Sequence, residues 1–146
     1  MIRIVRLLAC GFAMALGCIG GANAQDMLDM KGSWSGIGKG IVDGLAAHHP
    51  PSAPAKSADT HRLTEVPFTL KIEGQDDHRF WGIMSSPFRV EKIIGVISAG
   101  GKQIYVVTRD GFLDGVVRDN DTIDTCYRQL QPNSAVAACN TYKRGK

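Results

Sequence analysis

Hydrophobic and polar residues alternate in short runs along the chain from Lys31 onward, and Gly, Asp and Asn residues separate the runs. A period of two is typical of β-strands with one buried face, and no window carries the i, i+3, i+4, i+7 spacing of an amphipathic helix. The clearest run has four apolar residues on one face: Val66, Phe68, Leu70 and Ile72. Pro67 within this run predicts a sheet edge or a bulge. The pattern as a whole predicts an all-β protein.

Roughly eight strands are expected, and most are joined to the next by a short turn such as Asp110-Gly111. Their predicted ranges are 32–42, 66–73, 79–84, 88–97, 103–108, 112–117, 122–129 and 136–143. Sequential antiparallel strands can close into a barrel, which removes the exposed edges of an open sheet. We therefore expect an eight-stranded antiparallel up-and-down β-barrel, with a two-sheet β-sandwich as the alternative.

The segment near 43–62, between the first two runs, is rich in Ala, Pro, Ser and Lys. Because such a composition buries little apolar surface, we expect an exposed, mobile loop there. The loop holds the adjacent His48 and His49, whose spacing does not suit two ligands of one metal ion, and His61 and His78 lie apart from them. We expect no metal site.

The first 24 residues are typical of a secretory signal peptide. Arg3 and Arg6 form a charged region before an apolar stretch at 7–19, and Ala22-Asn23-Ala24 fits cleavage after Ala24. This stretch is shorter than the ~20 apolar residues that a membrane-spanning helix needs, so we expect no membrane span. The sequence predicts one mature domain at 25–146, in the periplasm or secreted. Lipidation at Cys18 is the alternative, because the residues before it resemble the box of bacterial lipoproteins.

The charge balance bears on the class of partner. The chain carries 17 basic and 14 acidic residues, and the leader accounts for two of the arginines and none of the acids. The mature part is therefore close to neutral, with both signs interspersed. A nucleic-acid-binding protein needs a basic face, so we expect no nucleic-acid partner.

The mature chain has two cysteines, Cys126 and Cys139, an even pair in an oxidising compartment. The midpoint between them falls at Pro132-Asn133, a dipeptide that suits a turn. If this turn is the centre of a hairpin, the cysteines lie opposite each other on neighbouring strands, close enough for a disulfide. We expect this disulfide; the alternative is an unpaired, redox-active thiol.

A Gly-x-Trp pattern, Gly32-Ser33-Trp34, opens the first predicted strand. Together with the eight-stranded meander and its disulfide, the pattern resembles the avidin and lipocalin barrels of the calycin type. The resemblance implies a small barrel in which Trp34 plugs one end. A biotin site does not carry over, because only two tryptophans are present and Ser35-Gly36-Ile37 lacks the asparagine expected there.

Most of the mature chain also resembles a group of small secreted alphaproteobacterial proteins of unknown function. Four segments carry this second resemblance: Gly32-Ser33-Trp34-Ser35-Gly36, Arg79-Phe80-Trp81-Gly82, Asp110-Gly111-Phe112-Leu113-Asp114-Gly115 and Cys126-Tyr127. It supports the fold and the compartment, and it implies no activity.

The candidate contact residues are aromatic. Phe80 and Trp81 are neighbours in a predicted strand, so one side chain should fill the barrel while the other faces outward. An outward aromatic side chain on a secreted barrel can contact a partner. We therefore take Trp34, Phe80 and Trp81 as possible ligand or partner contacts.

No arrangement of residues predicts catalysis. The sequence has neither a Gly-x-Ser-x-Gly elbow nor a glycine-rich phosphate loop before a helix. Aspartates gather in the last third of the chain, where they match no calcium loop and suit hairpin turns: Asp110, Asp114, Asp119, Asp121 and Asp124. We expect no enzymatic activity, cofactor or metal.

Two functions remain. The first is a binding protein whose barrel interior or mouth holds a small apolar or amphipathic ligand. The alternative is a periplasmic inhibitor or adaptor that presents segments 25–30 and 48–56 to a partner such as a protease or lysozyme. The apolar face at 66–72 predicts a filled interior, whereas the glycines of the first strand predict space at one side, so both interiors stay open.

Overall fold

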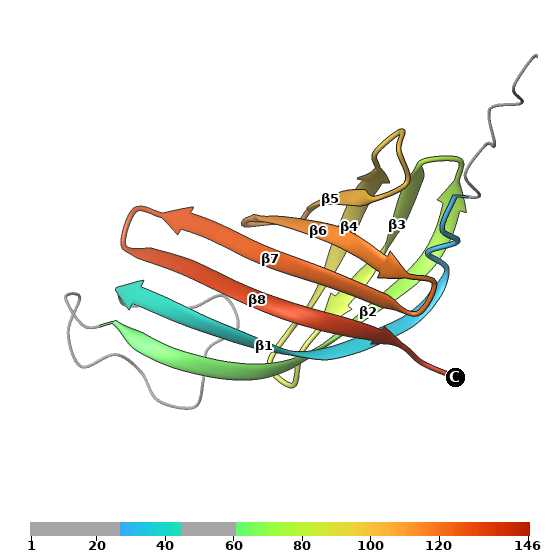
Figure 1. Ribbon diagram of the computed structural model, residues 1–146. Helices are drawn as coiled ribbons and strands as arrows, with labels where there is room; N and C mark the ends of the chain where they lie inside the picture. The colour runs from blue at the N-terminus through green and yellow to red at the C-terminus, as the bar shows by residue number, and fades with distance from the viewer. Residues whose placement is uncertain (1–26, 45–60) are drawn as a thin grey trace, which may run out of the picture.

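The computed structural model describes residues 27–44 and 61–146, where eight antiparallel strands close into one barrel in sequential order (Figure 1). The strands are β1 Gly32–Gly44, β2 Arg62–Asp76, β3 Arg79–Ser85, β4 Val90–Ile97, β5 Gln103–Val107, β6 Phe112–Asp119, β7 Thr122–Gln131 and β8 Ser134–Arg144. Strand β8 pairs with β1 and closes the sheet. The predicted up-and-down barrel is confirmed, and the sandwich alternative is wrong.

Several predictions fall on residues outside the described ranges. They are the signal peptide at 1–24 with its cleavage site, lipidation at Cys18, the histidines His48 and His49, and most of the loop near 43–62. The bounds of that loop need correction, because β1 continues to Gly44 and β2 begins at Arg62. Arg62 of β2 pairs with Val42 of β1, whereas the added residues Asp43 and Gly44 of β1 pair with β8.

Alternation of apolar and polar residues builds the barrel wall. Strand β2 shows it most clearly, because Val66, Leu70 and Ile72 are buried while Lys71 and Glu73 are exposed. Its inward residues Leu70 and Ile72 join side chains of the other strands in one core that includes Trp34 and Ile104. Closure follows from burying this face all around, since an open sheet would leave two unpaired edges.

Strand length differs between the two sides of the barrel. Strands β1, β2, β7 and β8 have 13, 15, 10 and 11 residues, whereas β3 to β6 have between 5 and 8. The four long strands therefore project past the short ones at one end of the barrel (Figure 1). We call this end, where β1 finishes at Gly44, the open end, and the end that holds Trp34 the closed end.

The segment at 27–31 crosses the closed end and seals it. Leu28 and Met30 are buried in the core, and the side-chain amide of Gln75 binds the backbone of both. The indole Nε1 of Trp34 donates to the Met30 carbonyl at 2.8 Å, and the Arg144 guanidinium lies 4.0 Å from the indole centroid. Trp34 plugs this end as the resemblance implied. Residues 27–30 thus belong to the fold and do not form a free contact arm.

Pro67 lies at a local sheet edge, as its lack of an N–H predicts. It pairs with Ile37 of β1, whereas pairing between β2 and β3 begins at Thr69. The irregularity of β2 lies farther along, between Ile72 and Gly74. No helix within the described residues is long and apolar enough to cross a membrane.

Candidate functional site

The inward face of β1 carries three glycines between Trp34 and Val42. A Cβ atom on Gly38 would lie 3.0 Å from the Phe68 ring, and one on Gly36 would collide with the Asn140 side chain. The missing side chains therefore give Phe68 and Asn140 room to reach across the interior. The filled interior and the interior with space, which the sequence left open, are each partly right. Side chains fill the space over the β1 glycines next to Trp34, and space remains toward the open end.

That space is a cavity of about 60 Å³, which we call the barrel cavity. Long strands supply most of its wall, and the core residues Met84 and Leu113 also line it. The described residues that line it are Gly38, Val42, Thr64, Val66, Phe68, Met84, Leu113, Thr125, Tyr127, Gln129, Val136, Ala138, Asn140 and Tyr142. Phe68, Val136 and Ala138 are only half-buried, so the described part of the wall leaves the cavity partly exposed at the open end.

Few polar groups face this mostly apolar cavity. The Tyr127 hydroxyl donates to Oε1 of Gln129 at 3.2 Å. The Asn140 amide differs, because its Nδ2 and Oδ1 are buried without a hydrogen-bond partner among the described residues. Leaving a buried polar group unpaired costs about 1–3 kcal/mol, so this amide is poised for a partner that enters the cavity.

The phenols of the cavity are neutral over the physiological range. Burial raises the pKa of Tyr127 to about 12. Burial also raises the pKa of Tyr142. The Asn140 amide lies near the phenol and offsets part of that rise, although no hydrogen bond of good geometry joins the two side chains. Both shifts oppose ionisation, since a phenolate would lose its hydration in this apolar setting.

The predicted contact residues lie elsewhere. Phe80 is 2% exposed and fills the core, whereas Trp81 is 47% exposed and faces outward, which confirms their predicted opposite orientations. Trp34 lies in the closed end. The structure does not bring the three together, and none of them lines the barrel cavity.

Sequence reasoning did not single out Asn140 or Gln129. Their signal was a polar residue at an inward position of a strand: Asn140 has the same parity in β8 as the buried Tyr142, and Gln129 has the parity of the buried Thr125 in β7. A polar residue at such a position is either paired in the core or available to a ligand.

Trp81 begins an apolar row on the outside of the barrel. Cross-strand pairing joins Trp81 to Ile94, Ile94 to Val107, and Val107 to Phe112 across β3 to β6. Each of these side chains is between 45 and 63% exposed. We call these four residues the outer apolar row.

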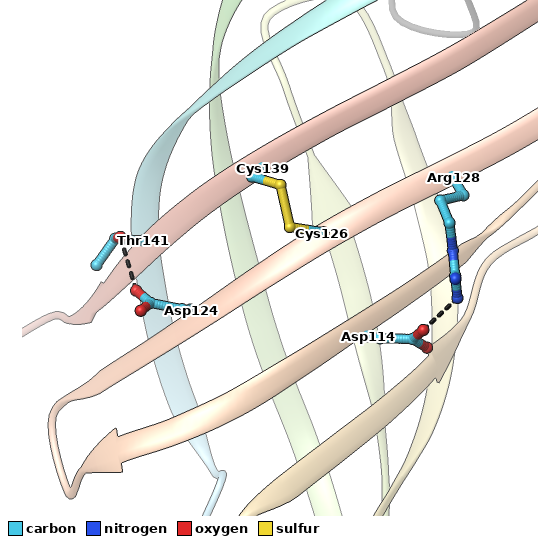
Figure 2. The surroundings of a disulfide bond; sticks show 6 residues. All are labelled: Asp114, Asp124, Cys126, Arg128, Cys139 and Thr141. Atoms are coloured by element: carbon cyan, nitrogen blue, oxygen red, sulfur yellow. Dashed lines mark hydrogen bonds and ion pairs between the residues drawn. A yellow bond between two sulfur atoms is a disulfide. The ribbon is translucent and has the colours of Figure 1, made fainter.

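The predicted disulfide joins β7 to β8 on the outer wall, as Figure 2 shows. Cys126 and Cys139 are paired directly across the hairpin, with Cα atoms 4.1 Å apart. The Pro132-Asn133 turn lies at the hairpin centre, since Gln131 pairs with Ser134. Both the bond and its predicted position are confirmed.

Two of the aspartates predicted to form turns lie instead on strands beside this disulfide. Asp114 pairs with Arg128, while Asp124 accepts from the Thr141 hydroxyl at 2.7 Å (Figure 2). Asp124 also pairs with Arg118. The Thr141 hydroxyl, followed by Arg118, lowers the pKa of Asp124. These two carboxylates thus serve cross-strand pairing, which the sequence did not reveal because strand register decides it.

Asp119, a predicted turn residue, and His78, for which no metal site is expected, both make contacts with residues close to them in the sequence. Asp119 accepts from the Asp121 backbone N–H at 2.8 Å, as in a hairpin turn. The Nε2 atom of His78 lies 3.7 Å from an Asp77 carboxylate oxygen. Within 27–44 and 61–146, no three His, Cys, Asp or Glu side chains are grouped so that they could hold a metal ion.

The fold and the cavity together define a small, disulfide-bonded, eight-stranded antiparallel β-barrel with an apolar interior space. No protein-family model matches the sequence, and no curated protein matches it. A solved structure that is similar is the S-type phycobiliprotein lyase CPES from Guillardia theta, at 10% sequence identity and a TM-score of 0.33. That match covers 80% of this chain and 89% of the lyase chain. A likeness this distant does not bear on function.

Proposed function

We propose that this protein binds a small apolar or amphipathic ligand in the barrel cavity. The observation that carries the proposal is the Asn140 amide, which has no hydrogen-bond partner among the described residues and lines a largely apolar, partly exposed cavity. Ligand sites combine an apolar wall with a few polar groups that orient the ligand. The lining offers that combination with Asn140, Gln129 and Thr125 as its polar set.

We propose binding without catalysis, in the periplasm or outside the cell. The described lining of the cavity has no carboxylate, imidazole, amine or thiol that could serve as a general base or strong nucleophile. The leader pattern at 1–24 and the Cys126–Cys139 disulfide support an oxidising compartment.

Filling the cavity should abolish binding. We expect native mass spectrometry of the protein purified from a periplasm to show a bound mass that is lost on denaturation. Ala138 lines the cavity and Ala137 is exposed on the same strand, so Ala138→Leu should remove the bound mass and the matched Ala137→Leu should keep it. A bare wild-type protein, or a mass kept by Ala138→Leu, would contradict the proposal.

The outer apolar row supports a second candidate function, a barrel that binds a protein partner. Single exposed apolar residues are ordinary, but a continuous row across four strands is less so. Lys92 and Arg109 flank the row in sequence, and neither forms an ion pair with a described residue. The row therefore fits a partner surface with an apolar centre and acidic side chains at its rim.

The second function predicts a complex that depends on Trp81. Affinity purification from a periplasmic extract should recover one acidic protein in a stoichiometric amount with the wild type. Trp81→Ser should weaken this complex by tenfold or more, since aromatic anchors carry much of the energy of an interface. Recovery unchanged by Trp81→Ser would remove the outer apolar row from consideration.

A further inference from the structure

We infer that the ligand of the barrel cavity is a neutral molecule with one small, carboxamide-like head group, which enters the cavity and pairs with Asn140. This inference rests on the proposed function and narrows it to a ligand class. Three features of the site carry it: its size, its lack of charge and the hydrogen-bonding pattern of the Asn140 amide.

Size sets the first limit. A water needs roughly 10–15 Å³ of such space, so a cavity of about 60 Å³ holds on the order of four to six waters. The cavity is less than half as large as the ~150 Å³ of an engineered cavity that binds benzene. The head group of a ligand therefore fits inside, and the rest of a molecule the size of one ring extends toward the open end.

Charge sets the second limit. None of the described lining residues carries a formal charge, and the two phenols, Tyr127 and Tyr142, are neutral. Besides burial, the charges of Glu91 and Asp110 raise the pKa of Tyr127 and that of Arg89 lowers it, so the charges nearest this phenol are mainly negative. A carboxylate that enters therefore loses its hydration without gaining a favourable counter-charge, and the cavity should reject carboxylates in favour of neutral molecules of the same shape.

The hydrogen-bonding pattern of the Asn140 amide sets the third limit on the ligand. A carboxamide presents two N–H donors and one carbonyl acceptor side by side, and neither polar atom of Asn140 has a hydrogen-bond partner among the described residues. A second carboxamide is complementary to this pattern, because it can donate one hydrogen bond and accept another in the same plane. Gly36 leaves the room that the Asn140 side chain occupies, because any side chain on Gly36 would overlap it.

Three probes of one shape test the class: benzamide, toluene and benzoate. We expect titrations followed by NMR of the full mature protein to show benzamide binding about tenfold more tightly than toluene, and benzoate at least tenfold more weakly than benzamide. A factor of ten corresponds to 1.4 kcal/mol, in the range of one satisfied buried amide. Equal affinities for benzamide and toluene, or preference for benzoate, would overturn the inference.

A variant pair assigns the effect to Asn140. Asn140→Leu keeps a branched side chain of similar size and should lower benzamide affinity about tenfold, while toluene affinity stays the same or rises. Gln103→Leu makes the same kind of change on the exposed outer wall and should alter neither. If Asn140→Leu does not fold, the ranking of the three probes on the wild type still decides. Failure of all three probes to bind would count against the proposed function itself, whereas binding without discrimination would count only against the ligand class.

Discussion

Replacing Trp34 with alanine should lower the free energy of unfolding by about 3–5 kcal/mol, the range for truncating a buried aromatic side chain. Trp34 has no exposed surface, donates its indole N–H to the Met30 carbonyl and stacks under Arg144. The substitution therefore opens a cavity, leaves a buried carbonyl unpaired and removes a cation–π contact. Since small domains are stable by only about 5–15 kcal/mol, we expect a large part of the stability to be lost.

Urea denaturation followed by circular dichroism measures this loss without depending on tryptophan fluorescence. The second tryptophan provides a matched control, because Trp81 is 47% exposed and Trp81→Ala should cost about 1 kcal/mol or less. Trp34→Phe, which keeps most of the buried ring, should lie between the two. Equal losses for Trp34→Ala and Trp81→Ala would show that Trp34 does not hold the closed end together.

The barrel was predictable because its local signals agree with one another. Apolar and polar residues alternate in β2 from Phe68 to Glu73, and the turn at Pro132-Asn133 sets the register that brings the cysteines together. Phe80 and Trp81 lie on opposite faces of the sheet because successive side chains of a strand alternate between its two faces. In each of these cases, the deciding interaction spans a few residues of sequence.

The open end was less predictable for a physical reason. Strand β2 starts at Arg62 because its backbone pairs with β1 as far as Val42, and β1 continues through Asp43 because that part of it pairs with β8. Side-chain patterning predicts burial, whereas backbone hydrogen bonding needs no apolar residue. The extra length matters to the candidate function, since these long strands form much of the cavity wall.

The site itself depended on register between distant strands. Asn140 is a ligand-facing candidate only because Gly36 on β1 leaves room for it, and the two residues are more than a hundred positions apart. The outer apolar row likewise exists only because four strands align Trp81 with Ile94, Val107 and Phe112. A single sequence shows which residues are polar or apolar, but closure of the barrel decides which of them meet.

Removing the Cys126–Cys139 disulfide should lower the free energy of unfolding by about 2–4 kcal/mol, near 3 kcal/mol for a loop of this size. The bond closes a short loop, with a sequence separation of 13, and its cysteines are exposed on the outer wall. Replacement by serine therefore leaves no cavity in the core, and the loss comes mainly from greater freedom of the unfolded chain. Pairing along the full length of β7 and β8 should keep the barrel folded without the bond.

Urea denaturation of the Cys126→Ser/Cys139→Ser double variant, beside the wild type with and without a thiol reductant, measures this effect. Reductant should lower the wild-type midpoint to that of the double variant and leave the double variant unchanged. A wild-type midpoint that does not move would mean that the disulfide contributes no stability. A larger loss, with collapse of the circular dichroism signal before urea is added, would mean that the β7–β8 hairpin cannot hold its register alone; the barrel cavity, which both strands line, would then depend on an oxidising compartment.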